Sequence, residues 1–81
     1  MSTKNSHPGF ELNDILSSNN ITQRDFAAKI GITVSLLNSI LKGTRNINVN
    51  IAISLEVAGY GKATQWMEKQ INFLIFMKIR H

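Results

Sequence analysis

The chain has 81 residues, which is enough for one domain that buries only about 60% of its unfolded surface. It contains no cysteine, which excludes a disulfide framework, thiolate zinc sites and cysteine nucleophiles and is compatible with a reducing compartment. Nine Lys and Arg residues outnumber five Asp and Glu residues, and the resulting net charge of +4 favours contact with polyanions.

The first residues lack the apolar segment of a signal peptide, and no run of eighteen apolar residues occurs. We therefore expect a soluble cytoplasmic protein without a membrane span. Residues 1–7 are polar, and we expect them to form a disordered N-terminal arm.

A first helix is predicted from about Gly9 to Ser18. Pro8 fits its first turn, where the missing N–H group has no intrahelical partner to lose. The apolar residues of this segment recur at helical spacing: Phe10, Leu12, Ile15 and Leu16.

Residues 23–42 have the pattern of two short helices joined by a tight turn. Gly31 stands where a helix would end in the left-handed conformation that glycine adopts freely. Thr33 then offers a hydroxyl to cap the next helix, as Thr22 does for the helix before it. Ala27, one turn before Gly31, is small enough for the two helices to approach closely. This arrangement predicts a helix-turn-helix.

The two helices should bury their apolar faces and leave polar faces outside. The residues predicted to face inward are Phe26, Ile30, Val34, Leu37, Ile40 and Leu41. The residues predicted to face outward from the second of these helices are Thr33, Ser35, Leu36, Asn38, Ser39 and Lys42.

The second half of the chain predicts two more helices. Gly43 ends the preceding helix, residues 44–46 form a polar loop, and Ile47 anchors that loop to the core. Asn48 can cap a helix that ends at Gly59 or Gly61 and buries Ile51, Ala52, Leu55 and Ala58. A fifth helix is predicted from about Ala63 to Phe73, with Trp66, Met67, Gln70, Ile71 and Leu74 at helical spacing.

In the segment from residue 71 to the end, six residues between Phe73 and Ile79 are apolar and cover every face, so helix and strand both remain open for it. Such a surface exceeds what one small domain can hide, and we expect a partner to cover it. The predicted organisation is therefore an arm (1–7), a helix-turn-helix domain (8–61) and a C-terminal helix with an apolar tail (62–81). Candidate residues for a dimer or partner surface are Trp66, Phe73, Phe76 and Met77, with packing inside the domain as the alternative for each.

Thr22-Gln23, Ala27-Ala28, Gly31, residues 33–41 and 43–45 together resemble the lambda-repressor-like (Xre-type) helix-turn-helix family. Pro8-Gly9 before the first helix and Trp66 after the fourth are similar to HigA-type (VapI, plasmid-maintenance) antitoxins. The resemblance implies an all-α, five-helix DNA-binding domain. It also implies a dimeric repressor of its own operon that neutralises a small ribonuclease toxin of RelE-like fold.

Residues of two kinds would then contact double-stranded DNA. Phosphates would be held by Gln23, Arg24, Thr44 and Arg45. Base edges in the major groove would be reached by Thr33, Ser35, Asn38 and Ser39. Asn38 gives the most specific prediction, because its amide can pair with adenine. Leu36 can contact a thymine methyl group. Lys42 is the single charged residue of this recognition helix.

Other functions remain open. The fold can be an ordinary pair of helices that serves as a protein-interaction module, or a phage Cro-like regulator without a toxin partner. An enzyme is not expected, because the chain has no cysteine, two terminal histidines and no glycine-rich phosphate loop. We also expect no cofactor and no metal, since His7 and His81 lie in presumed mobile ends without a third ligand.

Overall fold

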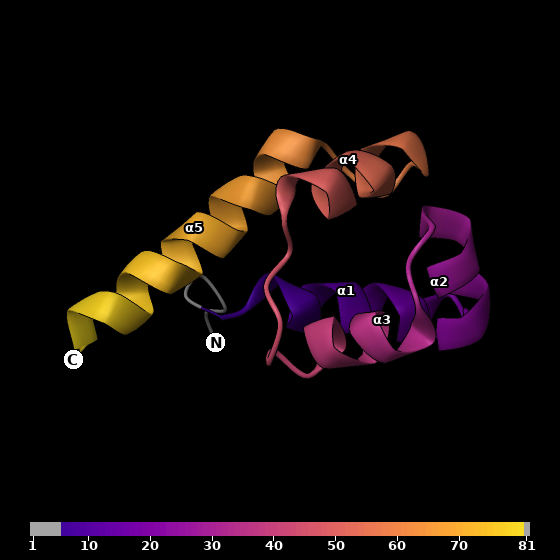
Figure 1. The fold of residues 1–81 in the computed structure, drawn as a ribbon, viewed down its shortest axis with the longest axis horizontal. Coiled ribbons are helices and arrows are strands. Elements are labelled where there is room, and N and C mark those ends of the chain that lie inside the picture. Colours follow the sequence, from indigo (N-terminus) through magenta and orange to yellow (C-terminus); the bar gives the residue numbers. More distant parts are fainter. Residues whose placement is uncertain (1–5, 81) are drawn as a thin grey trace.

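The computed structural model describes residues 6–80, which form five helices and no strand (Figure 1). The helices are α1 (Pro8–Ser18), α2 (Gln23–Ile30), α3 (Val34–Leu41), α4 (Val49–Val57) and α5 (Ala63–Arg80). In Figure 1, α1 and α3 lie side by side, α2 closes one end, and α5 runs diagonally away from α4. The all-α, five-helix prediction is confirmed.

Side-chain caps explain where three of the helices begin. Thr22, Thr33 and Asn48 have extended backbones, and the side-chain oxygen of each accepts the N–H of the residue three positions on, at 2.8–3.1 Å. These bonds satisfy N–H groups that have no partner inside the helix. All three caps were predicted from the sequence.

The turn between α2 and α3 is made by Gly31, which adopts φ 76° and ends α2. The N–H of Ile32 then donates to the carbonyl of Ala27 at 3.0 Å, as in a glycine-terminated helix. Ala27 is 1% exposed, so this small residue is buried in the core.

Gly9 sets the contact between α1 and α3. A Cβ atom at this position would lie 1.8 Å from the carbonyl oxygen of Ile40. Any side chain would therefore collide with the backbone of α3, and only glycine lets the start of α1 pack against the end of the recognition helix.

The core lies between all five helices and includes the α3–α4 loop through Ile47. Its buried apolar residues are Leu12, Leu16, Phe26, Ala27, Ile30, Leu37, Ile40, Leu41, Ile47, Ile51, Ala52, Leu55 and Trp66. Four predicted core positions differ, and one of them, Ile15, is only partly buried. Val34 is 45% exposed because it opens α3 before the helix reaches the core, Phe10 is 48% exposed because its ring covers Gly43 at the surface, and Ala58 is only partly buried.

The prediction of a disordered arm through residue 7 is wrong at His7. This residue is 1% exposed and caps α1, its Nδ1 atom accepting the N–H of Gly9 at 2.9 Å. The same finding corrects the placement of His7 in a mobile end. Ser6, also in the predicted arm, is described and partly buried, whereas residues 1–5 and His81 lie outside the described residues.

Helix α5 extends to Arg80, so the predicted end at Phe73 is wrong and the open choice between helix and strand is settled. No glycine or proline follows Gly61, and nothing in the sequence stops the helix. Its C-terminal half projects from the body of the fold (Figure 1). Within residues 6–80, no helix is both long and apolar enough to cross a bilayer.

Candidate nucleic-acid interface

Helix α3 buries one face and presents the other. Leu37, Ile40 and Leu41 point into the core, whereas none of the ten predicted DNA-contacting residues is buried. The exposed ones are Arg24, Thr33, Ser35, Lys42, Thr44 and Arg45, and the partly exposed ones are Gln23, Leu36, Asn38 and Ser39. The predicted set is accessible to a duplex laid along α3.

The start of α2 is joined to the middle of α3 by a side-chain hydrogen bond. Asn38 Nδ2 donates to Gln23 Oε1 at 3.3 Å. The bond uses one of the two amide N–H groups of Asn38 and leaves the other, together with Oδ1, for a base. Asn38 can thus still make a bidentate contact with adenine, from an orientation fixed by Gln23.

The loop after α3 is tied to that helix through one carbonyl group. The Ser39 oxygen accepts the backbone N–H of Thr44 at 2.9 Å, its hydroxyl at 3.1 Å and the N–H of Arg45 at 3.3 Å. Both donors of Thr44 are used within the fold in this structure, and its contact with a phosphate stays a prediction. Arg45 keeps its guanidinium in solvent and is the phosphate-binding candidate of this loop.

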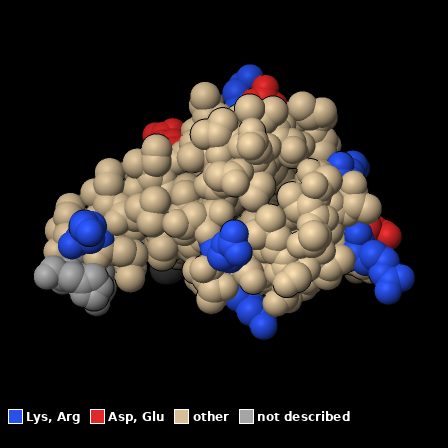
Figure 2. Space-filling model, in the orientation of Figure 1, with Lys and Arg blue, Asp and Glu red and all other residues tan. Residues whose placement is uncertain are grey.

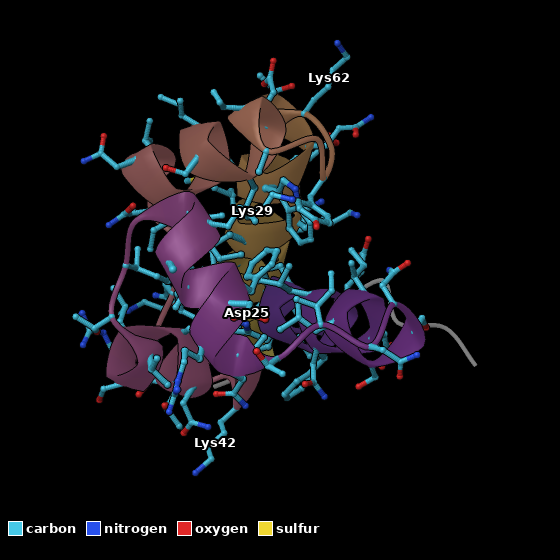
Figure 3. The ribbon with its side chains drawn as sticks, turned by 90° about the vertical axis from the view of Figure 1, so that its right-hand side faces the viewer. Asp25, Lys29, Lys42 and Lys62 are labelled. Carbon is cyan, nitrogen blue, oxygen red and sulfur yellow. The ribbon has the colours of Figure 1, made fainter. Side chains whose placement is uncertain are left out.

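The basic side chains near α3 are free of acidic partners. Arg24, Lys42 and Arg45 form no ion pair among residues 6–80, where the ion pair present joins Glu11 to Lys69. Figure 2 shows blue basic groups along the lower and right-hand edges, over α3 and α2. In Figure 3, Lys42 projects below α3, far from Lys62 at the opposite edge. Phosphates brought to this side would meet uncompensated positive charge.

The residues predicted for a dimer or partner surface differ from those that the structure exposes on α5. Trp66 is 3% exposed and its indole N–H donates to the carbonyl of Tyr60 at 2.9 Å, so it belongs to the core and not to an interface. Phe73 and Phe76 are partly buried, and Met77 is 37% exposed. The prediction selected three aromatic residues and Met77 and left out four aliphatic residues on α5 that are more exposed: Ile71, Leu74, Ile75 and Ile79.

Comparison with known protein families shows to which family the chain belongs. A family profile described as helix-turn-helix (HTH_3) matches residues 14–58, more than half of the chain. The chain belongs to this helix-turn-helix family. The match contains α2, α3 and the turn at Gly31, and it makes the chain a DNA-binding regulator.

Two solved structures share the fold of this helix-turn-helix protein. A candidate antidote protein of a plasmid maintenance system from Nostoc punctiforme has 28% sequence identity and a TM-score of 0.88, over 91% of this chain and 81% of that one. An addiction-module antidote protein of the HigA family from Coxiella burnetii has 22% identity and a TM-score of 0.85, over 94% of this chain and 84% of that one. A search of curated proteins finds no match.

The helix-turn-helix family and these neighbours are DNA-binding regulators and antidote proteins rather than enzymes. Among the residues that the structure describes, no three His, Cys, Asp or Glu side chains are grouped so that they could hold a metal ion. The polar residues Ser35, Asn38 and Ser39 lie together on the outer face of α3.

Proposed function

We propose that this helix-turn-helix protein is a dimeric repressor of its own operon and the antitoxin of a HigBA-like pair, whose toxin is a small ribonuclease. The observation that supports sequence-specific binding most is the hydrogen bond between Asn38 and Gln23 beside the outer face of α3, because an asparagine amide can pair with adenine. A cytoplasmic location is part of this proposal.

Dimerisation is proposed because one recognition helix reads only a few base pairs. A dimer would place two such helices in successive major grooves, about 34 Å apart. The surface proposed for this contact is the projecting half of α5, where Ile71, Leu74, Ile75 and Ile79 are 43–78% exposed. A group of exposed apolar residues as large as this one usually marks a contact surface for a partner.

The antitoxin role rests on a different observation, the similarity in fold to the Nostoc protein described as a candidate antidote, across 91% of this chain. A regulator without a toxin would serve equally well as a repressor. A neighbouring reading frame of about 90–110 codons, the size of one small domain, favours the antitoxin. Copurification of its product with this protein then tests the pair directly.

The proposed repressor activity is tested by fluorescence-anisotropy titration against the duplex immediately upstream of the gene, with a scrambled duplex as control. The proposal expects tighter binding to the upstream duplex, two chains per site, and affinity that falls steeply as salt rises. Equal and weak binding to both duplexes would contradict it. The helix-turn-helix would then serve as a scaffold for protein contacts.

A further inference from the structure

His7, near the start of the described chain, is buried and belongs to a polar cluster with Gln70, also buried, and Asn46, which is exposed; the predicted DNA contacts do not use this cluster. Its Nε2 atom lies 3.4 Å from Asn46 Oδ1, and the same oxygen accepts Gln70 Nε2 at 3.3 Å. Gln70 Oε1 in turn accepts the backbone N–H of Ile47 at 2.7 Å. His7 and Gln70 are each 1% exposed, and no buried polar side-chain atom among residues 6–80 lacks a partner. The cluster joins α1, the α3–α4 loop and α5.

The cluster borders the loop that carries Arg45. At its start, this loop is bound to the Ser39 carbonyl at the end of α3. At its far end, Asn46 and Ile47 are bound to His7 and Gln70. The backbone of Arg45 also lies within hydrogen-bonding reach of His7. The loop is thus held on both sides of Arg45.

We propose that His7, Asn46 and Gln70 are positioning residues for DNA binding, which fix the Arg45 loop beside α3 and connect it to α5, the helix proposed to form the dimer. The inference rests on the proposed repressor function. It adds that this function requires the neutral form of His7.

The hydrogen bonds at His7 define its protonation state. Nδ1 accepts the N–H of Gly9, so the proton of the neutral ring is on Nε2, directed toward Asn46. A second proton would have to go on Nδ1, where it would face the Gly9 N–H group. The cap of α1 would be lost, and α1 packs at Gly9 directly on α3.

Burial lowers the pKa of His7, while its hydrogen bonds to Asn46 and to the Arg45 backbone oppose this change. Charged groups from two helices share the pocket beside the ring: Glu11 and Asp14 on α1 and Lys69 on α5. Glu11 is already paired with Lys69 at 2.8 Å. These three groups sum to one negative charge, which would favour the protonated ring, but desolvation by burial is the largest influence on the pKa of His7 and lowers it.

The variant His7→Asn tests the role of the His7 ring while keeping the cap of α1. Asparagine is among the best helix caps, so it can still accept the Gly9 N–H, but it cannot titrate. Gln70→Met removes both hydrogen bonds of Gln70 with little change in volume. Circular dichroism at each pH confirms that every protein compared is folded.

DNA affinity is then measured by anisotropy with the upstream duplex. For the wild type, we expect affinity to fall about three- to thirtyfold between about pH 8 and pH 5, since one required neutral group changes affinity at most tenfold per pH unit. His7→Asn should lose this dependence, and because it also loses the contact between Nε2 and Asn46 Oδ1, it should bind several times more weakly than the wild type at the higher pH. Gln70→Met should bind several times more weakly at both pH values while remaining folded.

Two outcomes would overturn the inference alone: the same pH profile for the wild type and His7→Asn, or wild-type affinity in folded Gln70→Met. Absence of binding by the wild type at about pH 8 would instead overturn the proposed function, and the inference with it. His81 is present in all three proteins, so its titration contributes equally to each profile.

Discussion

Replacing Gly9 by alanine tests how closely α1 packs on the recognition helix. The new Cβ atom would lie 1.8 Å from the Ile40 carbonyl oxygen and 2.8 Å from its carbon, against 3.4–4 Å for ordinary contact. Both are backbone atoms of α3 and cannot rotate away. The two helices would have to separate by more than about 1 Å, which disturbs packing across the core.

Helix propensity alone predicts that Gly9→Ala stabilises the protein, whereas the contact with α3 predicts that it destabilises it. An alanine in an unobstructed helix position would stabilise the protein by about 0.5–1 kcal/mol relative to glycine. Overpacking against a rigid neighbour costs about 1–3 kcal/mol, and a backbone neighbour places Gly9→Ala at the upper end of that range. We therefore expect a net loss of about 2 kcal/mol, or a fall in Tm of about 8–16 °C for a domain of this size.

The assay is thermal and urea denaturation followed by circular dichroism. Ser17→Ala, at an exposed position of the same helix, is the matched control and should be neutral or slightly stabilising. If Gly9→Ala were as stable as the wild type or more stable, α1 would not pack on α3 as described. The route by which His7 influences the recognition helix would then be lost as well.

Three further predictions concern the cap, the charges and the partner surface. Thr33→Ala removes the cap of α3 and should lower the free energy of unfolding by about 1 kcal/mol, measured in urea. Lys42→Gln should lower the slope of log affinity against log salt by about 0.9, whereas Lys62→Gln, at the opposite edge, should leave the slope unchanged (Figure 3). Ile75→Asp should convert the dimer to a monomer in sedimentation, whereas Val57→Asp, at an exposed position on α4, should not. An unchanged slope for Lys42→Gln or an intact Ile75→Asp dimer would contradict the corresponding assignment.

Features that depend on neighbouring residues were predictable from the sequence. The turn at Gly31 and the caps at Thr22, Thr33 and Asn48 each need only a side chain and a backbone group three or four residues away. The helical periodicity of residues 23–41 likewise placed Phe26, Ile30 and Leu37 in the core. Local chemistry therefore gave the helix-turn-helix and the accessibility of its outer face.

Features that depend on distant contacts were not predictable. His7 is buried by partners 39 and more positions away, and nothing near it in the sequence indicates this. The same holds for Gly9, whose role arises from the Ile40 carbonyl on another helix. The Thr44 hydroxyl donates to the backbone carbonyl of Ser39, a contact that the sequence did not indicate. Residue type alone does not show which donors are already used.

The central claim is that the outer face of α3 reads base edges, and Asn38→Ala tests it most directly. The measurement is the ratio of affinities for the upstream and scrambled duplexes, for the wild type and the variant at one salt concentration. We expect the ratio to fall roughly five- to 150-fold, which corresponds to a loss of about 1–3 kcal/mol of binding free energy for the upstream duplex. Affinity for the scrambled duplex should stay the same. An unchanged ratio would show that α3 does not read sequence through Asn38.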